Sequence, residues 1–341
     1  MILRILFGSF VVLSTSKHTN KATTKTTTTK NMADPKEELN WDTHAKAYDK
    51  NIRRLTSLHA SDLIGSILPQ IRSAKTILDV GSGTGAFGHA YLDFFPEGIP
   101  GQKLILSDLS PGMIKQAEQS MLAKLPSNFQ TEIEFRVEDG TDLKGIDTDS
   151  IDIVISVFGA FLIPDREKVL EAVARVLVKG GIFANVSWSF ISVPVSFLSS
   201  INPVDFCFLR FSHNVRRQEG GFGAPFHASI IKSMKMLKDE FFDQPEAPWT
   251  NWFDPDNIRD MLQDRFEPPK IYRSIHSVTF ENSPILWDIL LNSNPFAKPE
   301  EQDPQRVEAA KKAFVGMITD GDETAPAYTV TASNLVIAYP R

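Results

Sequence analysis

The residues best suited to carry chemistry lie in a short glycine-rich segment, Asp79-Val80-Gly81-Ser82-Gly83-Thr84-Gly85. Glycines at these positions allow a tight turn and let the backbone approach a ligand with no Cβ in the way. A helix that begins after the segment would offer unpaired N–H groups to a ligand carboxylate. The pattern alone is a weak signal, because a strand-to-helix turn with no ligand can carry the same glycines.

Two further acids follow later apolar segments. Asp108, followed by Leu109, has the position of an acid that accepts hydrogen bonds from the two ribose hydroxyls of an adenosine. Asp139 could accept from an adenine amino group, with Gly140 or Thr141 offering a backbone N–H to a ring nitrogen. The structural alternatives are a loop-capping Asp108 and a solvated turn at Asp139.

An alternation of strands and helices is expected to position these residues. After a helical lead-in, Trp41–Ile71, the predicted strands are Lys75–Val80, Lys103–Ser107, Glu132–Val137, Ile151–Val157 and Ile182–Ser187, and the predicted helices are Ala86–Phe95, Pro111–Leu122 and Asp165–Val178. Ser110 should cap the second of these helices, and Gly180-Gly181 should end the third. Because neighbouring parallel strands end at one ligand crevice, we expect the three acids to lie along a single edge.

The rhythm changes after Trp188, where prolines and a glycine-rich turn predict an inserted helical cap over residues 189–253, with a helix at His227–Phe242. Further elements complete the sheet: helices Asp254–Arg265, Pro284–Asn292 and Asp303–Ile318, and strands Lys270–Thr279 and Tyr328–Ala338. The predicted fold is therefore α/β, with a doubly wound, mainly parallel seven-stranded sheet. Residues 32–341 are expected to form that domain.

Several segments together resemble the successive motifs of class I S-adenosylmethionine-dependent methyltransferases. They are ILDVGSGTGAFG from Ile77, SDLSPGMIKQAE from Ser107, VEDGTDL from Val137, DIVISVFGAFLIPDREKVLEAVARVLVKGG from Asp152 and FANVSW from Phe183. The start, WDTHAKAYD from Trp41, is similar to the N-terminal lid of the ubiquinone and menaquinone biosynthetic type. The resemblance covers Trp41–Trp188. The cap, with its run Phe206–Phe211, looks more like the variable substrate domains of fungal natural-product methyltransferases.

The resemblance implies a cofactor, S-adenosyl-L-methionine, and a role for each matching residue. Asp79 and the loop, Gly81, Ser82, Gly83 and Gly85, would hold the methionine half of the cofactor. Asp108 and Leu109 would hold the ribose, Asp139 and Gly140 the adenine, and Ser156, Val157 and Phe158 the wall near the sulfonium. Trp41 and Tyr48 would cover the cofactor, with simple helix packing as the alternative. The glycine spacing gives only modest support against a nicotinamide dinucleotide, which prefers G-x-G-x-x-G.

A catalytic residue cannot be assigned from the sequence. Methyl transfer from a sulfonium needs positioning and exclusion of water, and a base is required only where the acceptor must lose a proton. Weak candidates for that base are His213, His227, His276 and Glu281, each of which could equally be structural. Aromatic candidates for an apolar pocket are Phe158, Phe161, Trp188, Phe190, Phe226, Trp249 and Trp252.

Composition narrows the partners. A net charge of −6 with no dense basic block gives no indication of nucleic-acid binding. The single cysteine, Cys207, excludes an internal disulfide and a cysteine-built zinc site, and no His/Asp/Glu cluster has metal spacing, so no metal is expected. The 24 phenylalanines favour apolar walls and a small hydrophobic substrate. The sequence predicts no oligomeric state.

Residues 1–31 differ from the rest. The apolar run Ile5–Leu13 is followed by a Ser/Thr/Lys tract to Lys30, with no acidic residue before Asp34. Three interpretations stay open: an extension upstream of a second start at Met32, a mitochondrial-type presequence, and a short secretory or membrane anchor. The run is shorter than the ~20 residues of a bilayer span. We expect a disordered or targeting extension on a cytoplasmic protein, or on a mitochondrial one if the presequence is real.

The function predicted from these observations is methyl transfer to a small, apolar or aromatic metabolite at an O, N, S or C atom, in secondary metabolism. The close rival is a methyltransferase of quinone biosynthesis. A different class of protein, a regulator or cyclase that binds the cofactor without transferring methyl, has the same cofactor residues. A nicotinamide-dependent oxidoreductase is a third alternative.

Overall fold

The computed structural model describes residues 41–189, 252–292, 303–319 and 321–341. Residues 39–341 form one compact unit. The predictions of an extension at residues 1–31 and of a helix at His227–Phe242 fall outside the described residues, as does most of the predicted cap.

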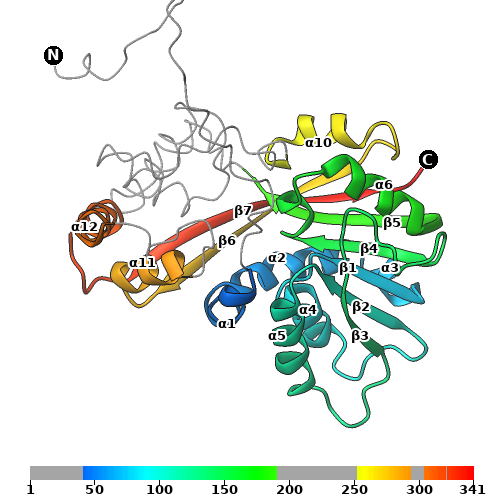
Figure 1. Ribbon diagram of the computed structural model, residues 1–341, viewed down its shortest axis with the longest axis horizontal. Helices are drawn as coiled ribbons and strands as arrows, with labels where there is room; N and C mark the ends of the chain where they lie inside the picture. Colours follow the sequence, from blue (N-terminus) through cyan, green and yellow to red (C-terminus); the bar gives the residue numbers. More distant parts are fainter. Residues whose placement is uncertain (1–40, 190–251, 293–302, 320) are drawn as a thin grey trace, which may run out of the picture. The chain divides into compact units, whose positions relative to one another are not determined.

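The described part of the chain contains one seven-stranded sheet with the order β3-β2-β1-β4-β5-β7-β6 (Figure 1). The first five strands are parallel, and β7 runs antiparallel to both β5 and β6. The strands are β1 (Thr76–Val80), β2 (Lys103–Asp108), β3 (Glu132–Val137), β4 (Ile151–Val157), β5 (Leu177–Trp188), β6 (Lys270–Phe280) and β7 (Ala327–Ala338). The predicted doubly wound, mainly parallel sheet is confirmed.

Helices cover both faces of this sheet. The connections from β1 to β2 and from β2 to β3 move along the sheet in one direction, whereas the connection from β4 to β5 moves in the other. Because such connections are almost always right-handed, α4 (Ala86–Phe94) and α5 (Pro111–Leu122) lie on one face and α6 (Arg166–Val176) lies on the opposite face. The strand order therefore reverses between β1 and β4, where ligands bind in open α/β sheets.

The predicted helical lead-in consists of three helices rather than one. They are α1 (Trp41–Asn51), α2 (Arg53–Ser66) and α3 (Leu68–Ser73). The break before α3 follows from Pro69, which is tolerated in the first turn of a helix but not in its interior. Helix α2 packs against α4 and against the sheet strands β4, β5 and β6, so the lead-in is part of the main body. The later helices are α10 (Pro255–Leu262), α11 (Ser283–Asn292) and α12 (Pro304–Thr319).

The end of α6 corrects one expectation. The helix ends at Val176, before the two glycines, and Leu177 already has extended backbone at φ −71° and ψ 134°. Leu177 pairs with Ile151 of β4, and the register shifts before Ile182 pairs with Ile153. Pairing with the sheet therefore ends the helix, and Gly180, at φ +79°, lies inside β5.

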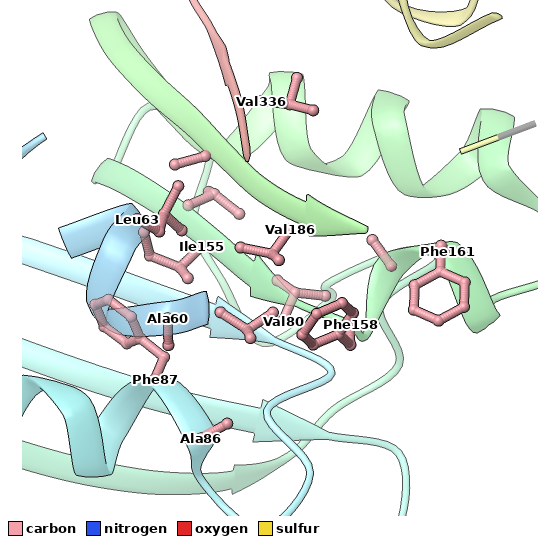
Figure 2. Packing of buried hydrophobic residues seen from close by; sticks show 14 of the residues in the cluster. Ala60, Leu63, Val80, Ala86, Phe87, Ile155, Phe158, Phe161, Val186 and Val336 are labelled. Atoms are coloured by element: carbon pink, nitrogen blue, oxygen red, sulfur yellow. The ribbon is translucent and has the colours of Figure 1, made fainter. Parts of the chain in front are cut away.

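The core is a continuous apolar cluster between the sheet and its helices. Figure 2 shows Leu63 of α2, Phe87 of α4, Ile155 of β4 and Val186 of β5 within it, with Phe158 and Phe161 just beyond the end of β4. No helix in the described part of the chain combines the length and the hydropathy that a bilayer crossing needs.

Candidate active site

The glycine-rich segment is the turn between β1 and α4, as the sequence predicts. Gly81, Gly83 and Gly85 all have positive φ, at 66°, 55° and 85°. Residues with a Cβ rarely adopt this backbone, which explains a glycine at every second position. A Cβ added to Gly83 would meet no atom of the chain within 4 Å, so the turn is open at that residue. The space in front of Gly83 suits a ligand that contacts the backbone.

Asp79, the last but one residue of β1, is fully buried. Neither of its carboxylate oxygens has a hydrogen-bond partner among the described residues. Burial raises the pKa of Asp79 well above its usual value, and the nearby charge of Asp108 raises it further. Buried polar groups are nearly always paired, so this carboxyl requires a donor from outside the described structure. An ammonium group, such as that of the methionine half of a cofactor, is a donor of the right charge.

The N-terminus of α4 also lacks a partner. Its N-cap is Gly85, and no described side chain caps the helix. By contrast, the Ser110 side chain caps α5 as predicted, accepting from the backbone N–H of Met113. Uncapped N–H groups at a helix start attract a carboxylate. The turn therefore presents a buried acid for an amine and a helix start for a carboxylate, the two charged groups of an amino acid.

Asp108 lies at the end of β2, next to the glycine turn. Its Oδ2 accepts from the backbone N–H of Gly83 at 2.8 Å, and its Oδ1 accepts from the N–H of Ser110 at 2.9 Å. Burial raises the pKa of Asp108, the two N–H donors oppose that shift, and the negative charge of Asp42 adds to it. A carboxylate has about four acceptor sites, so sites remain for two ribose hydroxyls.

Two apolar side chains flank Asp108: Leu109 follows it directly, and Val137 pairs with it from β3. Leu109 and Val137 are 55% and 52% exposed, although both are large aliphatic residues. Asp139 follows β3, and its Oδ1 accepts from the N–H and the hydroxyl of Thr141, both at 2.8 Å. A flat apolar ring such as adenine would cover Leu109 and Val137 and reach Asp139. Val137 was not predicted as a site residue; its signal is a β-branched residue at a strand end directly before the acids.

The loops after β1 and β4 meet at the point where the strand order reverses. A Cβ on Gly159 would lie 2.5 Å from the carbonyl oxygen of Gly81 and 2.7 Å from that of Val80, so only glycine fits there. Ser156 joins the same loops: its Oγ donates to the carbonyl of Val80 at 2.7 Å and accepts from the N–H of Ala160 at 2.8 Å. Ser156 therefore holds the wall together, and its contact with a cofactor stays a prediction.

Aromatic rings form a wall beyond the ends of β4 and β5. The ring of Phe158 stacks on that of Trp188, with centroids 3.9 Å apart and planes at 26°. Phe158 has φ +56°, a left-handed conformation that is strained for an aromatic residue and that is found mainly where a site requires it. Phe161 and Phe253 contact each other nearby, at 6.3 Å between centroids. The wall is apolar and is held in one arrangement.

The first helix, α1, carries the two aromatic residues that were predicted to cover the cofactor. Trp41 and Tyr48 contact each other edge to face, at 6.0 Å between centroids. Burial raises the pKa of Tyr48 to about 12, and the charge of Asp108 contributes to that rise. Tyr48 is thus close enough to Asp108 to sense its charge, as a residue covering an adenosine site must be. The predicted covering role of Trp41 and Tyr48 stays a prediction.

Of the predicted candidates for a catalytic base, two lie within the described residues, and their surroundings differ. His276, on β6, contacts Asp62 of α2 through Nε2 at 2.9 Å, and its side chain is 23% exposed. The same Asp62 oxygen accepts from Ser274 Oγ. Glu281 is an exposed residue directly after β6. The remaining candidates, for a base or for the pocket wall, lie outside the described residues: His213, His227, Phe190, Phe226 and Trp249.

The predicted end of the cap belongs to the core. Trp252 is 1% exposed and Phe253 is 3% exposed. The carbonyl of Trp252 accepts from Ser187 Oγ at 2.6 Å, and the carbonyl of Phe253 accepts from Asn334 Nδ2 at 3.0 Å. Among the described residues, no group of three or more His, Cys, Asp or Glu side chains could hold a metal ion.

Residues 77–181, which contain the glycine turn, both later acids, Phe158 and Phe161, match the family model described as a methyltransferase domain. The chain therefore contains a methyltransferase domain, and S-adenosylmethionine is its cofactor. The cofactor fits the residues present, because Asp79 has two unpaired buried oxygens and the turn at Gly83 is open. In this methyltransferase, those two residues would hold the methionine half and Asp108 the ribose.

Three solved structures are similar to the methyltransferase at low sequence identity. The YcgJ protein of Bacillus subtilis is 16% identical, with 83% of this chain and 98% of that chain covered and a TM-score of 0.47. A phosphoethanolamine N-methyltransferase 2 of Haemonchus contortus, in complex with phosphomonomethylethanolamine and S-adenosylhomocysteine, is 12% identical. The match covers 88% of this chain and 58% of that chain, with a TM-score of 0.43. A structure described by the conversion of a disulfide bond into a thioacetal group during echinomycin biosynthesis is 16% identical. The match covers 80% of this chain and 79% of that chain, with a TM-score of 0.43.

Proposed function

We propose that this methyltransferase acts on a small apolar or aromatic metabolite, in secondary metabolism. The observation that carries the proposal is the aromatic wall at the ends of β4 and β5, where Phe158 stacks on Trp188. Phe158 has a left-handed backbone, and Phe158 and Trp188 are 5% and 7% exposed. An apolar ring of an acceptor would pack on such a wall with favourable aromatic geometry.

The chemistry asked of the chain is modest. S-adenosylmethionine, when bound, supplies a methyl group on a sulfonium sulfur that is a good leaving group. Asp79, Gly83 and Asp108 would hold the cofactor, and its sulfonium would give the methyl group to the acceptor. The contribution of the chain is to align the acceptor and to exclude water, for which the rigid wall at Phe158 is suited.

An acceptor that carries a proton must also lose it, and we assign that step to the pair of Asp62 and His276. Asp62 contacts Nε2 of His276 and so orients the imidazole, which leaves the other ring nitrogen to take the proton. Asp62 lies on α2 and His276 on β6, where His276 is paired with Thr331 of β7. The next residue of β7, Ala332, accepts a hydrogen bond from Ser189, the residue directly after β5. This contact lies at the edge of the sheet at which β5 ends.

Labelled S-adenosylmethionine tests the function directly. The enzyme is incubated with the methyl-labelled cofactor and a metabolite extract, and the labelled product is identified by mass. We expect label on one small apolar compound, and much less label with the Asp108→Ala enzyme at the same cofactor concentration. Intact cofactor binding with no labelled product from any extract would contradict the proposal and favour a protein that binds the cofactor without transferring methyl.

The proposed base has its own test once an acceptor is known. His276→Asn should lower kcat by about 10²- to 10⁴-fold, the usual contribution of a general base, and should remove the lower limb of the pH profile of kcat. Asp62→Asn should lower kcat by less, because the imidazole remains. An unchanged pH profile in His276→Asn would show that the acceptor loses its proton without this residue.

A further inference from the structure

Helix α1 is attached to the start of helix α5 by one carboxylate. Asp42 Oδ1 accepts from the hydroxyl of Ser110 and, at 2.7 Å, from the backbone N–H of Gly112. The Ser110 bond holds the pKa of Asp42 below its usual value, and the Gly112 bond lowers it further. The two donors belong to the first turn of α5, so an acid of α1 satisfies part of another helix's N-terminus.

The contact requires glycine on the α5 side. A Cβ on Gly112 would lie 2.8 Å from both the Cα and the Oδ1 of Asp42. The Cα belongs to the backbone of α1, so moving the Asp42 side chain alone would not relieve the clash. Helix α1 therefore approaches α5 more closely than any other residue at position 112 would allow.

Ser110 extends this contact to the cofactor site. Its hydroxyl donates to Asp42, while its backbone N–H donates to Asp108 Oδ1 at 2.9 Å. Asp108 Oδ2 accepts in turn from the N–H of Gly83 at 2.8 Å. A continuous path of hydrogen bonds thus runs from α1, through the cap of α5 and the ribose acid, to the glycine turn.

We propose that Asp42 is a positioning residue for cofactor binding, which docks α1 on the site through Ser110 and couples that docking to Asp108. The proposal rests on the assignment of Asp108 to the cofactor. With α1 docked, Ser110 holds one Asp108 oxygen in place, and Tyr48 of α1, which contacts Trp41, lies near enough to Asp108 to be affected by its charge. Because coupling is reciprocal, a bound cofactor holds α1 down, and a docked α1 slows cofactor release.

The test measures cofactor release and the docking of α1 in the full chain. Asp42→Ala should weaken S-adenosylmethionine binding about tenfold, within the usual range of coupling between sites, mainly through faster release. Asp42→Asn keeps an acceptor oxygen and should recover most of the affinity. Gly112→Ala should resemble Asp42→Ala, because it displaces the same carboxylate from the other side.

A matched control lies on the same helix. Asp49 of α1 also reaches α5, accepting from Gln116 Nε2 at 3.2 Å, and it pairs with Arg53 of α2. Asp49→Asn should leave cofactor release within about twofold of the natural enzyme, because in the described structure Asp49 is not part of the path through Ser110 and Asp108. Hydrogen exchange of α1 without cofactor should rise in Asp42→Ala, which reports docking even if the cofactor assignment fails.

A double-variant cycle separates coupling from simple packing. In the Asp108→Ala background, adding Asp42→Ala should weaken cofactor binding further by less than about threefold, because the path is already broken. Full additivity of the two substitutions, or unchanged cofactor release in Asp42→Ala, would overturn the proposal. If Asp108→Ala itself binds the cofactor normally, the assignment of Asp108 is wrong, and the exchange data on α1 still stand.

Discussion

At the scale of single residues, the site is built from groups that are costly to the ligand-free fold. Asp79 is buried with both oxygens unpaired by any described residue, and Phe158 has a left-handed backbone. Isolated carboxylates avoid such surroundings, and strain of this kind costs ~1–3 kcal/mol. Both residues belong to the predicted cofactor site, so a role in binding explains these features better than a contribution to stability does.

Replacing Asp79 with Asn tests whether this carboxyl lowers the stability of the fold and serves cofactor binding. The pKa of Asp79 is raised in the folded state, so its contribution to stability is lost as pH rises above the usual pKa of the carboxyl. At neutral pH the amide, which cannot ionise, should therefore raise the free energy of unfolding, because the cost of keeping a raised-pKa carboxyl buried is removed. Cofactor affinity should fall. Calorimetric unfolding and cofactor titration measure the two, and lower stability with unchanged affinity would refute the assignment.

His59 provides a second prediction, on pH. It is fully buried, its Nδ1 contacts Ser274 Oγ at 2.8 Å and its Nε2 contacts Thr331 Oγ1 at 2.9 Å, and burial lowers its pKa to about 3. The unfolded chain takes up the proton near pH 6.5, so stability is full above that pH and falls as pH decreases toward 3. Between pH 7 and pH 5 this histidine should cost about 2 kcal/mol.

Urea unfolding at several pH values checks the prediction. His59→Gln should be less stable at pH 7, since its hydrogen bonds and its ring contact with Phe158 are altered, but it should lose less stability toward pH 5. His89, whose pKa burial lowers to about 4, contributes in the same direction and remains in the variant. Equal losses in the variant and the natural enzyme would show that His59 is protonated in the fold.

At the scale of elements, the two loops at the reversal of strand order depend on close backbone approach. Gly159→Ala would place a Cβ 2.5 Å from the carbonyl oxygen of Gly81, so the loops must separate. We expect cofactor affinity to fall at least tenfold, because the turn that contains Gly83 moves. Gly65→Ala, on α2 with no positive φ and no described atom within 4 Å of its added Cβ, is the control for a glycine substitution away from the site. A greater loss of affinity in the control would contradict the argument.

The elements also show what can be predicted from sequence. Strand ends and acids were predictable, because apolar runs followed by Asp79, Asp108 and Asp139 have a local signature. The approach of Gly159 to Gly81 and the contact of Asp42 with Ser110 were not, because each joins segments distant in the chain. The end of α6 was misplaced for the same reason: pairing of Leu177 with β4, not Gly180, ends it.

At the scale of the whole molecule, we expect different parts of the chain to bind the methyl donor and the acceptor. The parallel strands and their loops, within residues 77–181, hold every predicted cofactor residue except those of α1. The predicted cap at residues 189–253 follows β5 directly, where the aromatic wall lies. The prediction that the cap selects the acceptor rests on a segment with little sequence signature, which is why the sequence indicates the cofactor more sharply than the substrate.

The most direct test of the account is titration calorimetry with S-adenosylmethionine on the natural enzyme and on Asp108→Ala. Hydrogen bonds to a charged group are worth ~1.5–3 kcal/mol each, so the loss of those to the ribose should weaken binding tenfold or more. Asp256→Ala, which removes an exposed ion pair with Arg259 on α10, should bind as the natural enzyme does. The account predicts measurable heat, lost or much weakened only in Asp108→Ala; no heat with the natural enzyme, or equal affinity in all three, would contradict it.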